Sequence, residues 1–233
     1  MRFLLSPSKT MEATKPCKGQ SILFPDMRRQ VLEHLRMYAL DELQSYYGVN
    51  RKIAEENYQR LQDFKETNTA LYAYTGQQFK YLDAPSLLKN EADYLNDHLV
   101  ILSAMYGAVR PYDCIGLYRL PMALKMGGTK LSIRWRETLV PHFKGETLIN
   151  LASAEYADAL KGLPMITIDF LVPGKKGLKR APAMEAKKLR GLFVRKAAEA
   201  NIQEPEALKA FHVDGYTFEA SHSDASTYAF TKD

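Results

Sequence analysis

The chain has 233 residues, of which 46% are hydrophobic and 25% charged, and its net charge is +5. This composition is typical of a soluble globular domain large enough to bury its own core. No apolar run approaches the ~20 residues that cross a bilayer, and only three apolar residues follow Arg2, too few for a signal-peptide core. We therefore expect a single domain over residues 1–233, in a cytoplasmic monomer without a membrane partner.

Positive charge is concentrated in two segments. Residues 175–196 contain nine Lys and Arg against Glu185 alone, and residues 110–136 contain six against Asp113 alone, so the remainder is net acidic. Such concentration indicates a polyanionic partner, nucleic acid or nucleotide. A solvated basic face is the alternative interpretation.

The first predicted strand is Arg2–Leu5, and a polar loop with Ser6 and Lys9 follows it directly. Hydroxyl groups and a cation at a strand end favour phosphate binding. A serine nucleophile with a lysine base is the alternative, although the SPSK spacing differs from the SxxK spacing of enzymes that use that pair.

Residues 27–45 carry apolar side chains at helical spacing, and a second helical run follows Asn50, which suits an N-cap. The joining sequence GVNRKIA resembles the turn of helix-hairpin-helix DNA-binding modules, which present backbone amides to a phosphate. Any helical hairpin is the alternative. The element spans about 27–65, and its expected DNA contacts are Tyr47, Gly48, Val49, Asn50, Arg51 and Lys52.

Residues 70–74 are predicted to form a strand and residues 85–97 a helix ahead of a central buried strand, Leu99 to Ser103. Strands and helices therefore alternate, as in α/β proteins with a mixed sheet flanked by helices. Ligand sites in such sheets gather beyond the carboxyl ends of the strands.

Polar residues follow the central strand closely. Ser103, Tyr106, Arg110 and Arg119 suit an anionic, ring-bearing partner, and we expect Ser6 and Lys9 to lie beside Ser103 and Arg110. A structural corner with solvated arginines is the alternative.

A predicted helix over 133–143 contains Trp135, expected in the core, and a predicted strand over 147–150 follows it. Asn150, Ser153 and Glu155 make this the third strand that ends in polar groups, and we count them with Ser6, Lys9, Ser103, Tyr106, Arg110 and Arg119 in a candidate anion cleft. An N-cap is the alternative role of Ser153.

The chain closes with a predicted strand over 165–172, a helix over 183–200 and a β-hairpin built from residues 215–219 and 226–230. Gly191 interrupts the helix, which predicts that another element approaches its backbone there. The basic residues of this helix that we expect to contact DNA are Lys187, Lys188, Arg190 and Arg195.

Cys17 and Cys114 do not make a disulfide framework, and neither stands in a CxxC or metal-ligand spacing. A thiol peroxide sensor at Cys114 is a further hypothesis. The five histidines are scattered, and we expect neither a metal nor a cofactor.

Four motifs together resemble the bacterial YaaA proteins, a peroxide-stress group, nearly from end to end. They are LLSPSKT, LSAMYGAVRPYD followed by YRLPM, INLASAEY, and AKKLRG. The resemblance implies a compact α/β structure with a positively charged cleft and a helix-hairpin-helix element. It also implies DNA binding, protection of DNA from hydrogen peroxide and restraint of free intracellular iron.

Carried over by position, the resemblance assigns the hairpin to residues 48–52. It assigns the cleft to Ser6, Lys9, Tyr106, Arg110, Arg119, Lys187, Lys188 and Arg190.

We therefore predict a protein that binds double-stranded DNA through its phosphates, largely without sequence preference, in the oxidative-stress response. No residue is assigned a catalytic role in this interpretation. The alternative is an enzyme acting on a nucleotide or nucleic acid in the same basic cleft, and a sensor of a phosphate ligand is a third class.

Overall fold

The computed structural model describes residues 1–14, 16–175 and 177–232. Its main sheet has nine strands among these residues, in the order β11-β12-β13-β9-β8-β1-β3-β4 with β10 paired to β9. The strands are β1 (Arg2–Leu5), β3 (Leu99–Ser103), β4 (Gly107–Val109), β8 (Leu148–Asn150), β9 (Ile166–Gly174), β10 (Gly177–Arg180), β11 (His212–Val213), β12 (Tyr216–Phe218) and β13 (Thr227–Lys232). Two short ribbons join β2 (Asn68–Thr69) to β5 (Cys114–Ile115) and β6 (Lys125–Met126) to β7 (Thr129–Lys130).

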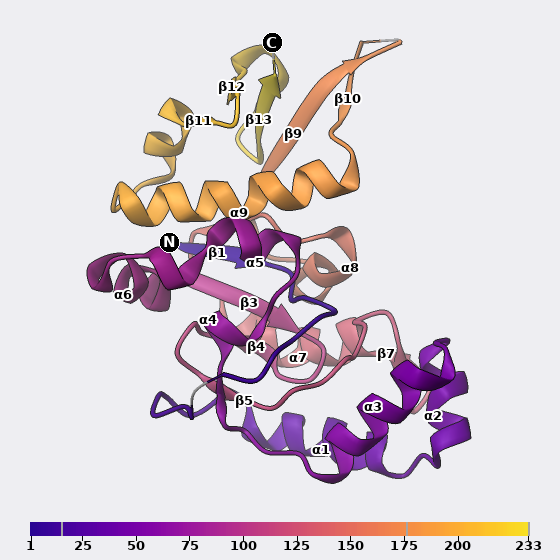
Figure 1. Ribbon diagram of the computed structural model, residues 1–233. Helices are drawn as coiled ribbons and strands as arrows, with labels where there is room; N and C mark the ends of the chain where they lie inside the picture. The colour runs from indigo at the N-terminus through magenta and orange to yellow at the C-terminus, as the bar shows by residue number, and fades with distance from the viewer. Residues whose placement is uncertain (15, 176, 233) are drawn as a thin grey trace.

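The helices lie around this sheet, and in the view of Figure 1 α9 runs across it, with the C-terminal strands above and β1 and β3 below. Helices α1 to α3 gather at the opposite end of the molecule. The helices are α1 (Pro25–Arg36), α2 (Leu40–Tyr47), α3 (Arg51–Gln62), α4 (Ala70–Ala73), α5 (Gln77–Leu82), α6 (Lys89–His98), α7 (Leu131–His142), α8 (Ala154–Ala157) and α9 (Ala183–Glu199). Among the described residues, none of these helices has the length and apolar character needed to span a bilayer.

The centre of the sheet is parallel and buried. Strand β1 lies between β8 and β3 and is parallel to both, and every residue of β3 is buried. Strands β8, β9 and β13 are also parallel, whereas β4, β10 and the closing β12–β13 hairpin are antiparallel. The predicted mixed α/β sheet and its C-terminal hairpin are confirmed, and the polar ends of β1, β3 and β8 face one edge.

Trp135 is fully buried, as predicted, and its indole Nε1 donates a hydrogen bond to Ala104 O at 2.8 Å. Gly107 has a φ of +73°, and a Cβ there would lie 2.4 Å from the Trp135 ring. Position 107 therefore requires glycine both for its backbone conformation and for the space that the indole occupies.

Two predicted elements are wrong. The helix expected over 27–45 is split into α1 and α2, because Glu42 accepts a hydrogen bond from Ala39 N at 2.8 Å and begins a new helix there. The strand expected over 70–74 is the short helix α4, whose Ala70 and Leu71 amides donate to the carbonyls of the loop before β5. A short buried apolar run does not distinguish a strand from a helix.

Gly191 brings α9 directly against α5, as its place in the helix predicts. A Cβ at residue 191 would lie 2.0 Å from Gln78 O and 2.9 Å from Leu82 N, so no side chain fits between the two backbones. The contact fixes the first half of α9, with its basic residues, beside the start of α5.

We predict that Gly191→Ala lowers the melting temperature, although alanine favours a helix by about 1 kcal/mol. The added methyl group must push α9 from α5, and overpacking of this kind costs about 1–3 kcal/mol. Thermal denaturation followed by circular dichroism measures the change. Gln30→Ala, at an exposed position of α1, serves as the control and should leave the melting temperature nearly unchanged.

Candidate functional site

A cavity of about 500 Å³ opens at the carboxyl edge of β1 and β8. Four segments line it: the loop after β1, the start of α5, the loop into α8 and the first turns of α9. The lining residues are Ser6, Pro7, Ser8, Lys9, Thr10, Thr75, Gly76, Gln77, Gln78, Lys80, Ser153, Glu155, Tyr156, Met184, Lys187 and Arg190. Ser6, Lys9, Ser153 and Glu155, which the sequence predicts for an anion cleft, are thus brought together with Lys187 and Arg190.

Ser6 and Ser153 join two of these segments. Ser153 N donates a hydrogen bond to Ser6 Oγ at 2.9 Å, and Ser6 Oγ donates to Ser153 Oγ at 3.2 Å. Ser153 occupies the N-cap position of α8 without a side-chain cap bond, so its hydroxyl is available to the cavity. Gln78 Nε2 donates to Ser6 O, which ties α5 to the end of β1.

Four basic side chains line the cavity, Lys9, Lys80, Lys187 and Arg190. Within the part of the chain that the structure describes, none of the four has a hydrogen bond or an ion pair through its side chain. The three lysines are exposed, whereas Arg190 is half-buried. Burial lowers the pKa of the Arg190 guanidinium, an effect that the Asp169 carboxylate opposes. A guanidinium keeps its charge in proteins, so these groups offer positive charge to an anion.

Arg119 lies in a narrower hollow beside the cavity. Both share Pro7, Ser8, Lys9 and Tyr156 in their walls. Arg119 also has no hydrogen bond or ion pair among the described residues. It thereby extends the group of unpaired basic side chains along the strand ends.

Two further polar residues of the predicted cleft, Glu155 and Asn150, form hydrogen bonds within the protein. Glu155 Oε1 accepts a hydrogen bond from Ala123 N at 3.1 Å, and Glu155 lines the cavity. Asn150 Oδ1 accepts from Ala152 N at 3.0 Å and its amide donates to Thr167 Oγ1 at 3.3 Å. Asn150 is 7% exposed and does not line the cavity.

Ser103 and Tyr106 lie in the core and outside the cavity. Ser103 Oγ is 2.6 Å from Tyr118 OH and accepts a hydrogen bond from Tyr106 N, while Tyr106 OH accepts from Gly116 N at 2.8 Å. Both residues are at most 1% exposed. Burial raises the pKa of Tyr118 to about 12. These groups shape the loop after β3 by bonding to one another.

Arg110 also holds this loop together. Its Nε donates to Asp113 Oδ1 at 2.9 Å, its Nη2 donates to Ser21 O at 2.6 Å, and the Asp113 carboxylate accepts from Arg110 N. Asp113 is fully buried, and this burial raises the pKa of its carboxyl group against the hydrogen bonds from Arg110. The structure therefore places Arg110 away from Ser6 and Lys9, in contrast to the sequence-based expectation.

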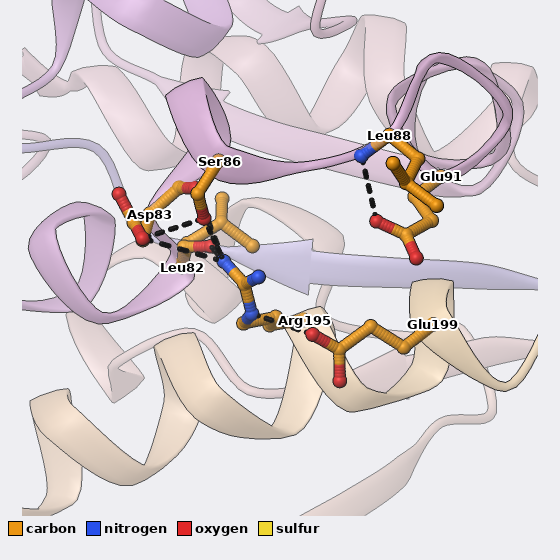
Figure 2. A network of polar contacts seen from close by, with 7 residues as sticks. All are labelled: Leu82, Asp83, Ser86, Leu88, Glu91, Arg195 and Glu199. Carbon is orange, nitrogen blue, oxygen red and sulfur yellow. Dashed lines mark hydrogen bonds and ion pairs between the residues drawn. The ribbon is translucent and has the colours of Figure 1, made fainter.

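Arg195 is likewise held by protein groups (Figure 2). Its Nη1 donates to Leu82 O and Asp83 O at 3.1 Å each and to Ser86 Oγ at 2.8 Å, and its Nε donates to Glu199 at 2.7 Å. These carbonyls end α5, so the arginine satisfies acceptors that the helix leaves unpaired. Lys188, its neighbour on α9, forms an ion pair with Asp214 at 2.7 Å.

The predicted hairpin consists of α2, a turn and α3. Gly48 has a φ of +59° and its N–H donates to Gln44 O, while Asn50 Oδ1 caps α3 by accepting from Ile53 N at 3.0 Å. Arg51 is paired with acidic neighbours, Glu55 at 2.8 Å among them. Lys52 is exposed and, within the described residues, unpaired. The hairpin lies far from α9, at the other end of the molecule (Figure 1).

Sequence analysis missed the α5 side of the cavity. Thr75, Gly76, Gln78 and Lys80 line it, and the only signal for them was the polar Thr75–Gly76 pair at the end of an apolar run.

The absence of a disulfide was also a wrong expectation. Cys17 and Cys114 are joined by a disulfide, with Cα atoms 5.6 Å apart and a sequence separation of 97. The spacing of two cysteines that are so far apart in sequence does not indicate whether they are in contact.

The chain matches known proteins over its whole length. A family model described as peroxide stress protein YaaA matches residues 1–222. The chain belongs to the YaaA family. A UPF0246 protein of Finegoldia magna is 34% identical, with 100% of this chain and 98% of the relative covered. A UPF0246 protein of Bordetella avium is also 34% identical, with 100% and 99% covered. Family membership therefore associates this fold with peroxide stress.

We predict that Arg110→Lys destabilises the fold by about 1–3 kcal/mol, because lysine cannot bond to Asp113 and Ser21 together and leaves the buried Asp113 carboxylate with fewer donors. Chemical denaturation measures the loss. Arg29→Lys, whose partner Asp26 is exposed, is the control and should change stability little. Equal effects of the two substitutions would contradict the anchoring role of Arg110.

Proposed function

We propose that this YaaA family member is a cytoplasmic monomer that binds double-stranded DNA through its phosphates, largely without sequence preference, during peroxide stress. The observation that supports the proposal is the group of unpaired basic side chains at one sheet edge. The group consists of Lys9, Lys80, Arg119, Lys187 and Arg190. We call it the cavity cation group.

Unpaired cations suit this role because an anion can approach them without breaking an existing ion pair. Arg190 is half-buried on a helix that Gly191 fixes, so its guanidinium loses little freedom when it binds a phosphate in bidentate geometry. The exposed lysines Lys9, Lys80 and Lys187 supply charge without geometric selectivity. Neutralised phosphates release counterions, which gives affinity with little dependence on sequence.

The helical hairpin is proposed as a second contact. The N–H groups of Gly48 and Val49 donate to Gln44 O, so the turn itself has few amides to offer. The free donors lie one step later, at the first two residues of α3, where a helix leaves its amides unpaired. Lys52 is at this position and adds a charge, so the hairpin contact rests on the start of α3.

An enzyme acting on a nucleotide or nucleic acid is the second candidate. It is favoured by the hydroxyl groups of Ser6 and Ser153, which lie at the cavity wall with Glu155. Incubation with mononucleotides and short duplexes, followed by chromatography of the products, tests it. Formation of a product that Ser6→Ala abolishes would favour the enzyme over the binding protein.

We predict that Lys187→Gln and Arg190→Gln each weaken duplex binding and lower the slope of log K against log salt by about 0.9, the contribution of one phosphate contact. Fluorescence anisotropy at several salt concentrations measures both quantities.

Lys144→Gln is the matched control, because Lys144 is exposed and unpaired within the described residues but follows α7 near the start of β8, at the opposite edge of the sheet. A slope that falls equally in the control would contradict a localised site. A flat salt response of the unaltered protein would remove the DNA-binding proposal.

We predict that Lys52→Gln also reduces the salt slope, by about 0.9 if the hairpin contacts one phosphate. The double variant of Lys52 and Lys187 should lose both contributions, because the two positions are far apart and their effects add. Anisotropy titrations of the single and double variants decide this. An unchanged slope for Lys52→Gln would contradict a phosphate contact at the hairpin.

A further inference from the structure

Between β1 and α1, the described residues 6–14 and 16–24 cross the surface without forming a helix or an extended strand (Figure 1, indigo). We call these residues the strap. Only Ser6 and Met11 of the strap are buried. Apart from these two buried residues, backbone hydrogen bonds hold the strap to the rest of the protein, for example the bond that Cys17 N donates to Thr67 O at 2.7 Å. Ile22, Leu23 and Phe24 at the end of the strap pack against the core, but the part before them buries little apolar surface and can open without unfolding the core.

The middle of the strap is fastened to the loop before β5. Gln20 N donates to Tyr112 O at 3.1 Å and Cys114 N donates to Gln20 O at 3.1 Å. Between the same two segments lies the Cys17–Cys114 disulfide, the single covalent link across this contact.

Both linked segments continue into the walls of the narrow hollow beside the cavity. The strap contributes Pro7, Ser8 and Lys9, and the segment after β5 contributes residues 118–121 with Arg119. A link between Cys17 and Cys114 therefore joins the two sides of the surface that carries Lys9 and Arg119.

We propose that Cys17 and Cys114 are a peroxide-responsive thiol pair whose oxidation locks the strap onto β5. Both cysteines are half-buried, so a small oxidant reaches their sulfur atoms. Gly19 N donates to Cys17 Sγ at 3.2 Å, and an amide that points at this sulfur stabilises its thiolate in the reduced protein. Disulfides in reducing compartments are usually transient and redox-sensing. Cys17 is the residue that peroxide attacks, and Cys114 resolves it.

The chemistry takes two steps. The Cys17 thiolate attacks one oxygen of hydrogen peroxide, the S–O bond forms, the O–O bond breaks, and hydroxide leaves, giving sulfenic acid. The Cys114 sulfur then attacks Cys17 Sγ, the S–S bond forms, the S–O bond breaks, and the departing hydroxide takes the Cys114 proton as water. Two thiols lose two electrons, which reduce one peroxide to water. A dithiol reductant reduces the disulfide and restores the two thiols.

The effect of this reaction on the cavity rests on the proposed function. Oxidation restricts the strap and so fixes Lys9 opposite Arg119, whereas reduction leaves the strap held by hydrogen bonds alone. The redox reaction itself involves no DNA. Its success or failure is therefore distinguishable from that of the DNA-binding proposal.

Intact-protein mass spectrometry and thiol alkylation test the redox step on the full chain. Reduced protein treated with hydrogen peroxide should lose both alkylatable thiols, and peptide mapping should join the peptides that contain Cys17 and Cys114. In Cys114→Ser, dimedone should label Cys17 as a sulfenic acid, while Cys17→Ser should give no adduct. Survival of both thiols in peroxide overturns the proposal, and an adduct on Cys114 alone overturns the assignment of Cys17.

Limited trypsin digestion tests the lock. Lys18 is exposed on the strap beside Cys17, and we expect cleavage there to be about tenfold slower in the oxidised protein, because the link suppresses local opening. Cleavage at Lys144 in the same digest is the internal control and should not depend on oxidation state. Equal rates at Lys18 in both states would show that the disulfide does not restrain the strap.

Discussion

The contact between α5 and α9 determines where the candidate site can form. Because position 191 carries no side chain, the α9 backbone lies against Gln78 O, and this approach places Lys187 and Arg190 over the end of β1. Gln78 is also the residue whose amide donates to Ser6 O, so one residue of α5 fixes both the helix above it and the strand end beside it. The wall of the cavity that α5 and α9 form is therefore a consequence of backbone packing.

Two groups of basic residues differ in what their side chains contact. Arg110 and Arg195 donate to carboxylates and carbonyls of the protein, and loss of Arg110 would remove donors from the buried Asp113 carboxylate. The cavity cation group has no such partners in the described residues, so its charge remains available to a ligand. The net charge of the chain therefore does not indicate which basic side chains are available to an anion. The distribution of partners decides which cations can bind phosphate, and it selects the strand edge that holds Ser6 and Ser153.

The sequence predicted the sheet better than the site. Apolar runs revealed β1, β3 and β8, and parallel pairing then required their polar ends to share an edge. The neighbours expected for Ser6 were Ser103 and Arg110, whereas the residue that Ser6 bonds to at this edge is Ser153. Gly191 was informative because a helix tolerates glycine poorly without a reason in packing. The role of Arg110 was not predictable, because its two acceptors include the backbone of Ser21, 89 residues away. For the same reason, Cys17 and Cys114 could be paired only in three dimensions.

The strap explains how a rigid core and a changeable surface coexist in one chain. Ile22, Leu23 and Phe24 at the end of the strap pack against the core, but the strap residues before them, 7–14 and 16–21, bury only Met11, so releasing that part costs the core little. Yet the strap carries Lys9 and the oxidisable Cys17 on the same short stretch of chain, and Cys114 leads within a few residues to Arg119. The Cys17–Cys114 disulfide links the strap, which few non-covalent contacts hold, to β5. A covalent link at a weakly held segment has a large effect on local opening. In a family associated with peroxide stress, this places an oxidant-sensitive bond next to the surface that offers charge to an anion.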